Sequence, residues 1–197
     1  MDAISKKELD EILDYGGQVR GVVLCTDAEY VRRNHGVESL LRVEEEARRM
    51  GYPINYRKIR AMHWYPVGLR VVSLVAIQKA LNLNPDKLRE MGRKAPKYSI
   101  ITKLMLRYFA NLDILVSRLQ SYWNKNYSVG SLTGKLQDKT LLICVKDCRI
   151  PKPLFPYLEG YFLAAIGMII GNQKQTRMEE GRWMHKNGTC YEFAIKW

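Results

Sequence analysis

The tetrapeptide His63-Trp64-Tyr65-Pro66 gathers side chains that could hold a small ligand. The rings of Trp64 and Tyr65 offer flat apolar surfaces, and the imidazole of His63 offers a polar contact. We therefore expect a site for a small apolar or aromatic molecule, lined by His63, Trp64, Tyr65, Tyr98, Tyr108 and Trp123. The alternative is that Trp64 and Tyr65 anchor the next helix as a hydrophobic staple, and that the other aromatics are ordinary core residues.

The cysteines raise the question of a zinc site. Zinc sites built on cysteine use closely spaced pairs such as Cys-x-x-Cys, whereas the nearest pair here, Cys144 and Cys148, is four residues apart. Cys25 and Cys144 lie in apolar runs, where a buried free thiol is the common case. The spacing predicts no metal site and free thiols in place of disulfides, with Cys190 as a small buried filler.

No arrangement typical of catalysis is found in the sequence. The chain has no Gly-x-Ser-x-Gly, no phosphate-binding glycine loop and no His-Glu-x-x-His. Asp147 stands next to Cys148, but a neighbouring carboxylate raises the pKa of a thiol and so does not activate it. We expect a binding domain that is not an enzyme.

Helical spacing dominates the middle of the chain. After Pro66, a residue suited to the first position of a helix, Val67, Val71 and Leu74 recur at the spacing of one buried stripe. By similar signals, further helices are expected around residues 5–16, 27–35, 37–50, 85–91, 101–108, 112–123 and 156–170.

Strand patterns occur mainly in the last third. Gln18–Cys25 is expected to be a buried strand, and residues 127–133 and 140–145 an antiparallel pair with a bend at Gly134. The last strands, 173–184 and 188–197, should form a hairpin around Asn187-Gly188, which favours a type I′ turn. In the final strand the residues expected on one buried face are Tyr191, Phe193, Ile195 and Trp197.

The order of these elements predicts the fold class. Helices and strands are segregated instead of alternating, which favours an α+β fold with a helical layer on an antiparallel sheet that ends in the C-terminal hairpin. A length of 197 residues, of which 47% are hydrophobic, suits one globular domain spanning 1–197, with residues 1–17 as an N-terminal helical extension.

The terminal pattern Gly-x-Cys-x-x-Phe-x-Ile-x-Trp, together with Trp64-Tyr65-Pro66 before an apolar helix, resembles an uncharacterised bacterial family first noticed in myxobacteria. That family is similar to 4-vinyl reductase domains and, more distantly, to haem and nitric-oxide-binding sensors and TRAPP subunits. The resemblance implies their fold, with a pocket enclosed between the helices and the sheet. It covers residues from about 18 to 197.

The same resemblance raises haem as a cofactor, and so a haem-based gas sensor as a further alternative. Haem sensors of this kind use a histidine on a helix and a Tyr-x-Ser-x-Arg motif for the propionates. This chain has no such motif, and none of His35, His63 and His185 lies in an apolar helical stripe. We therefore expect no cofactor.

The positive charge is concentrated in one segment. The net charge is +12, and residues 51–107 hold twelve Lys or Arg against Asp86 and Glu90. Such a field could serve a protein-interaction or non-specific nucleic-acid-binding module, which is the alternative function. No recognisable helix-turn-helix, RNA-recognition or zinc-finger pattern accompanies it, which argues against nucleic acid.

The N-terminus is polar and the longest apolar stretch, residues 161–170, is too short to cross a membrane, so we expect a cytoplasmic protein without a transmembrane segment. The sequence as a whole favours a non-catalytic sensory or regulatory domain that binds a small molecule. We expect it to dimerise through an apolar helix face and to act on a protein signalling partner.

Overall fold

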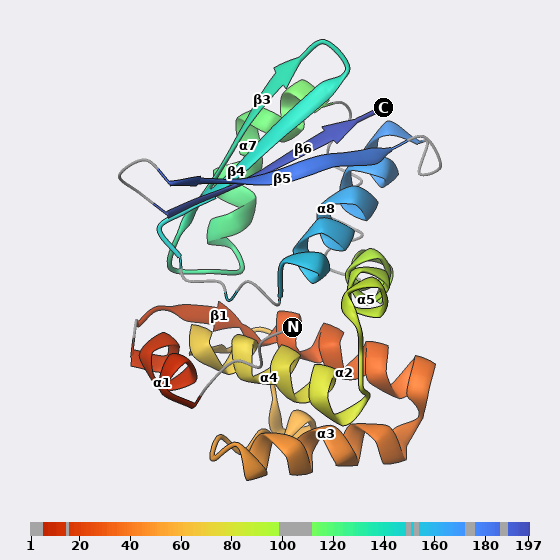
Figure 1. The fold of residues 1–197 in the computed structure, drawn as a ribbon. Helices are drawn as coiled ribbons and strands as arrows, with labels where there is room; N and C mark the ends of the chain where they lie inside the picture. The colour runs from red at the N-terminus through yellow and green to blue at the C-terminus, as the bar shows by residue number, and fades with distance from the viewer. Residues whose placement is uncertain are drawn as a thin grey trace.

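The helices and strands fall into a helical half and a sheet half (Figure 1). The computed structural model describes residues 6–14, 16–98, 112–148, 151, 154–171, 176–185 and 189–197. Within them the N-terminal segments form the helical half, and the C-terminal strands form an antiparallel sheet with two helices against it. The expected α+β class is confirmed.

The helical half is built around one apolar helix, α4. Its helices are α1 (Lys6–Asp14), α2 (Gly21–His35), α3 (Val37–Arg49) and α4 (Val67–Ala80), with a short 3₁₀ turn η1 at Tyr56–Lys58. All residues from 70 to 77 are buried, as expected for a helix that is covered on every side. Leu9 and Ile12 of α1 are also buried in this core, so the N-terminal helix packs on the domain.

The strand expected at Gln18–Cys25 is mostly wrong. Only Gln18–Arg20 is extended, as β1, and it pairs with β2 (Trp64–Pro66); α2 begins at Gly21. The first free amides of α2 donate to the loop before β2, Gly21 N to His63 O and Val22 N to Ala61 O, both at 2.8 Å. These tertiary bonds override the β preference of the valine run.

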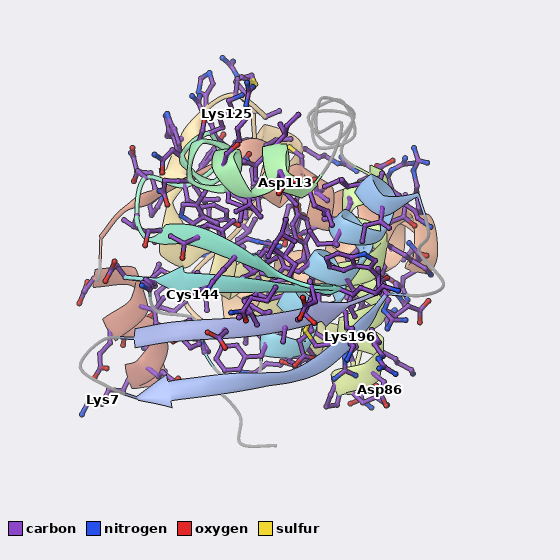
Figure 2. All side chains as sticks on the ribbon, turned by 90° about the horizontal axis from the view of Figure 1, so that it is seen from above. Lys7, Asp86, Asp113, Lys125, Cys144 and Lys196 are labelled. Atoms are coloured by element: carbon purple, nitrogen blue, oxygen red, sulfur yellow. The ribbon has the colours of Figure 1, made fainter. Side chains whose placement is uncertain are left out.

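The strands of the sheet half occur in the predicted order, although the first begins at Ser131 and not at residue 127. Its strands are β3 (Ser131–Gln137), β4 (Thr140–Lys146), β5 (Arg177–His185) and β6 (Thr189–Lys196), antiparallel in the order β3-β4-β6-β5. Tyr191, Phe193 and Ile195 are buried, as their alternation predicted. Figure 2 views the sheet from above, with Cys144 labelled on β4 and Lys196 on the neighbouring β6. The Asn187-Gly188 turn lies outside the described residues.

Two helices, α7 (Leu112–Asn124) and α8 (Phe155–Ile170), contribute to the core on the buried face of the sheet. The bend expected at Gly134 is wrong: this residue pairs with Ile143 inside β3, and the turn comes later, at Asp138. A Cβ on Gly134 would lie 2.5 Å from Leu119 Cδ1 of α7. The glycine therefore lets α7 lie directly on the sheet.

The two halves meet along α5 (Pro85–Tyr98), which packs against α8 (Figure 1). The helix expected at residues 101–108, which includes Tyr108, lies outside the described residues. Among the helices that the structure describes, none is both long and apolar enough to cross a membrane.

Candidate ligand-binding site

Two cavities lie where the helical half meets the sheet half. Their volumes are about 70 Å³ and about 80 Å³. The two linings have five residues in common: Arg70, Trp123, Tyr127, Tyr157 and Leu158. Taken together they approach the roughly 150 Å³ of an apolar cavity that accepts benzene.

The remaining walls are mainly apolar. The first cavity adds mostly aliphatic and aromatic side chains, among them Val22, Val23, Ala95, Leu132 and Phe162. The second adds Val67, Val71, Leu74, Val129, Cys148 and Leu154. Among the described lining residues, Arg70 is the one charged side chain, and no carboxylate lines either cavity.

Arg70 is held in the interior by a buried ion pair. Its guanidinium on α4 contacts the carboxylate of Asp27 on α2, and the two residues are 7% and 1% exposed. The Ser73 hydroxyl donates to Asp27 Oδ2 at 2.9 Å, and Ser73 in turn shares a 2.8 Å hydrogen bond with the hydroxyl of Tyr56. This network offsets the cost of burying a charge and fixes the guanidinium at the cavity wall.

Tyrosines surround the guanidinium. Arg70 Cζ lies 4.8 Å from the ring centroid of Tyr157, a cation–π distance. The hydroxyls of Tyr122 and Tyr161 are 2.6 Å apart. Burial raises the pKa of Tyr127, Tyr157 and Tyr161, so these phenols stay protonated at neutral pH and can donate hydrogen bonds.

The loop after α7 positions the aromatic wall. Trp123 Nε1 donates to Val129 O at 2.7 Å, and the Trp123 ring stacks on Tyr127 with centroids 4.3 Å apart. Val19 of β1 forms a β-bridge with Tyr127. Backbone hydrogen bonds between β1 and residues 126–128 therefore tie this wall to the helical half.

Of the residues predicted to bind the ligand, Trp123 lines both cavities. His63 is exposed, and the indole of Trp64 lies under the guanidinium of Arg20, 4.1 Å from Arg20 Cζ. The Tyr65 hydroxyl accepts a hydrogen bond from Arg60 N at 2.9 Å. His63, Trp64 and Tyr65 stand together at β2 and line neither cavity, so a ligand site there stays a prediction.

Tyr98 is also apart from the cavities. Its hydroxyl accepts a hydrogen bond from Asn34 Nδ2 at 2.8 Å, and its ring packs edge-on against Tyr30 at 6.1 Å. Arg70 and Tyr157 line both cavities but were not among the residues predicted from the sequence. A usable signal existed for Arg70, since it is a lone charge within the apolar run of α4, where a buried cation needs a partner.

The described cysteines differ in their chemical state. Among the described residues no group of three His, Cys, Asp or Glu side chains could hold a metal ion. Cys25 and Cys148 are free thiols, whereas Cys144 is disulfide-bonded, which corrects the expectation of a free thiol there. Cys144 lies half-buried on the outer face of β4, between the core-facing Ile143 and Val145, and the strand alternation could have shown this.

Part of the basic segment 51–107 is engaged within the fold. Arg70 is buried, Arg89 pairs with Asp86 and with Glu159 of α8, and Lys94 pairs with Glu90. Other basic residues of this segment, including Arg57, Lys58 and Arg93, are exposed. A binding role for this surface stays a prediction.

Comparison with solved structures identifies the architecture. An H-NOX protein from S. oneidensis in the Fe(II)NO ligation state aligns with a TM-score of 0.66 at 15% identity, covering 90% of this chain and 98% of that one. An oxygen-binding H-NOX domain related to soluble guanylate cyclases aligns with a TM-score of 0.62 at 15% identity, covering 90% and 94%. The chain has the H-NOX fold. No protein-family model matches the sequence, and no curated protein matches it.

The H-NOX fold confirms the expected similarity to haem and nitric-oxide-binding sensors at the level of structure. The link to 4-vinyl reductase domains and TRAPP subunits stays a prediction. Because the identities are below 20%, the likeness concerns the fold alone, and whether haem fits depends on the side chains of this chain.

The described cavity linings do not fit a haem. The two spaces together approach the volume needed for one benzene ring, and a porphyrin holds four pyrrole rings. Haem iron takes a histidine, thiolate, methionine or tyrosinate ligand. No histidine lines either cavity, and burial raises the pKa of Cys148 to about 12 and those of the lining tyrosines, which disfavours their anions. At Tyr127 the sequence reads Tyr-Ser-Val-Gly-Ser, without the propionate arginine.

Proposed function

We propose that this chain is a non-catalytic sensory or regulatory domain that binds a small molecule between its helices and its sheet. The observation that carries the proposal is the pair of cavities that share Arg70, Trp123, Tyr127 and Tyr157. Such a pocket, mostly apolar with a few converging polar groups, is typical of small-molecule sites. The H-NOX fold supports the proposal, since its solved examples include oxygen-binding and NO-ligated proteins.

The position of the cavities suggests how a ligand could act on the domain. Their walls include α2 and α4 of the helical half and α7, α8 and β3 of the sheet half. A ligand that contacts both halves favours the arrangement that it binds most tightly, by its difference in affinity. Dimerisation and a signalling partner remain predictions; the exposed apolar side chains on α3 are Val37 and Leu41, among the described residues.

A thermal-shift screen tests the proposal. The purified protein would be heated with toluene, phenol and short fatty acids, and a ligand of the native state should raise Tm. Ala95→Leu should abolish this rise, because it adds volume at the wall of the first cavity. Trp64→Ala serves as the control, because Trp64 lies outside both linings. No Tm rise with any compound would refute the pocket, and a loss confined to Trp64→Ala would place the site at β2.

A haem-based gas sensor is the second candidate, because oxygen-binding and Fe(II)NO-ligated H-NOX proteins share the fold. The absorption spectrum of freshly purified protein, before and after titration with hemin, distinguishes the two. A Soret band that saturates at one hemin per chain would favour haem. If the spectrum remained that of unbound hemin at every hemin-to-protein ratio, the small-molecule proposal would stand.

A further inference from the structure

Arg70 lies at the wall of both cavities, where its guanidinium contacts Asp27 and hydrogen-bonds to the phenols of Tyr127 and Tyr157. Its side chain is 8% exposed and lines both spaces. A guanidinium has five N–H donors, and the contact of Nη1 with Asp27 Oδ2 is an ion pair without an aligned hydrogen bond. Asp27 Oδ1 likewise has no hydrogen-bond partner among the described residues. The pair is therefore buried but incompletely satisfied.

The other polar groups in the linings are mainly donors. The phenol oxygens of Tyr127 and Tyr157 accept from Arg70, which leaves their O–H groups to donate to a ligand, whereas the hydroxyl of Tyr161 is paired with that of Tyr122 at 2.6 Å. The Thr26 hydroxyl is already donated to Val22 O at 2.8 Å. Arg70 is the one charged side chain in the described linings and its charge is paired with Asp27, so an anionic ligand would have to replace Asp27 as the partner of the guanidinium, and a cation would find no carboxylate in the walls.

Size restricts the ligand further. The combined volume approaches that of a benzene-binding cavity, and Arg70, Tyr127 and Tyr157 line both spaces. One aromatic ring, or an aliphatic chain of similar bulk, would lie against Trp123 and Leu158 and bring its head group to Arg70. A planar carboxylate suits this role, because it pairs with a guanidinium through two parallel hydrogen bonds.

We infer that Arg70 binds the carboxylate of a small aromatic acid, about the size of benzoate, beside the residues that line both cavities. The inference rests on the proposed function, because it names the chemistry of that ligand. In the absence of ligand, Asp27 is the only carboxylate that the described contacts place on Arg70, so the ligand and Asp27 compete for one guanidinium.

This competition can be tested, because removing the charge of Asp27 should strengthen benzoate binding only if Arg70 binds the ligand. Asp27→Asn keeps the side-chain shape and removes the competing charge, so Arg70 should bind benzoate about tenfold more tightly or better. The double variant Asp27→Asn/Arg70→Gln removes both charges and keeps a polar pair. This double variant should no longer bind benzoate but should still bind benzyl alcohol.

Isothermal titration of the full-length protein with benzoate, benzyl alcohol and benzylamine would measure these affinities. The wild-type order should be benzoate first and benzylamine last. Arg93→Gln removes an exposed arginine from α5 and is the matched control, whose benzoate affinity should equal that of wild type. Circular dichroism of each variant establishes that it is folded, and the wild-type order remains decisive if a variant does not fold.

The outcomes separate this inference from the function on which it rests. Binding of benzyl alcohol equal to or tighter than that of benzoate would overturn the carboxylate assignment and leave the pocket standing. An unchanged benzoate affinity in Asp27→Asn would overturn the role of Arg70. Failure of all three compounds, with no Tm rise in the wider screen, would overturn the proposed function as well.

Discussion

Gly92 of α5 and Gly160 of α8 each face the backbone of the opposite helix. A Cβ on Gly92 would lie 2.0 Å from Tyr157 O, and a Cβ on Gly160 would lie 2.0 Å from Arg89 O. Two reciprocal glycines thus allow the helices to touch backbone to backbone. Arg89 and Glu159 reinforce the contact with an ion pair of 2.9 Å. Because Tyr157 and Tyr161 lie within one turn of Gly160 on α8, this contact also sets the position of the cavity wall.

Gly92→Ala should therefore destabilise the protein, although alanine is normally the better helix former. The added methyl cannot fit against a backbone carbonyl, so α5 and α8 must separate, at a cost of about 1–3 kcal/mol. Urea unfolding followed by circular dichroism measures the change. Arg93→Ala, one residue along on the exposed side of α5, should leave the free energy of unfolding almost unchanged.

Gly92→Ala should also weaken ligand binding, since α8 carries the lining residues Tyr157, Leu158 and Tyr161. If Gly92→Ala were as stable as wild type and bound ligands equally well, the close approach of the two helices would be wrong.

The ion pair between Asp27 and Arg70 should behave as a unit. Arg70→Gln leaves a carboxylate buried without its cation, and we expect a loss of about 3–5 kcal/mol in the free energy of unfolding. Asp27→Asn/Arg70→Gln removes both charges and should cost less than the single change. A double-mutant cycle in urea measures the coupling between the two residues. Additive effects would mean that the pair contributes no interaction of its own.

The sequence predicted the sheet half better than the start of the helical half. Alternation in Tyr191, Phe193 and Ile195 is a local signal, and burial against α7 and α8 agrees with it. The start of α2 depends instead on the loop carbonyls of Ala61 and His63, about forty positions away in sequence. No local pattern in Gly21–Cys25 contains that information, so its valines predicted a strand.

The candidate site was only partly accessible from the sequence for the same reason. Trp123 was expected to bind a ligand, and it does line both cavities, but its neighbours there come from α4 and α8. The aromatic sequence at Trp64-Tyr65 was the strongest local signal. In the structure, however, Trp64 packs against the guanidinium of Arg20, and the Tyr65 hydroxyl accepts a hydrogen bond from Arg60 N. Which aromatics share a cavity is decided by helix packing, including the Gly92 and Gly160 contact.

Ligand binding should change the fluorescence of Trp123, whose ring borders both cavities. Displacement of water and contact with the ligand alter the surroundings of the indole, so emission should shift or be quenched in proportion to occupancy. Trp64→Phe should keep the full response, while Trp123→Phe should lose it. Both variants retain three other tryptophans, which gives a matched background. A response carried by Trp64 instead would favour the site predicted at β2.

Cys148 offers a final test through pH, because it lines the second cavity as a buried thiol. Burial first, and then the charge of Asp147, raises its pKa from about 9.0 to about 12. The unfolded chain therefore loses this proton at a lower pH than the folded chain. The thiol's contribution is fully present below about pH 9 and is lost as the pH rises toward 12.

Over that window the free energy of unfolding of wild type should fall more steeply than that of Cys148→Ala, by up to ~1.4 kcal/mol per pH unit. The comparison cancels the titration of the tyrosines, which both proteins share. Urea unfolding between pH 8 and pH 10.5 measures the difference in slope, and parallel curves would show that the thiol is accessible to solvent.

In a Cys25→Ser background, a ligand that fills the second cavity should also slow the reaction of Cys148 with a thiol reagent, since the ligand and the reagent would occupy the same space.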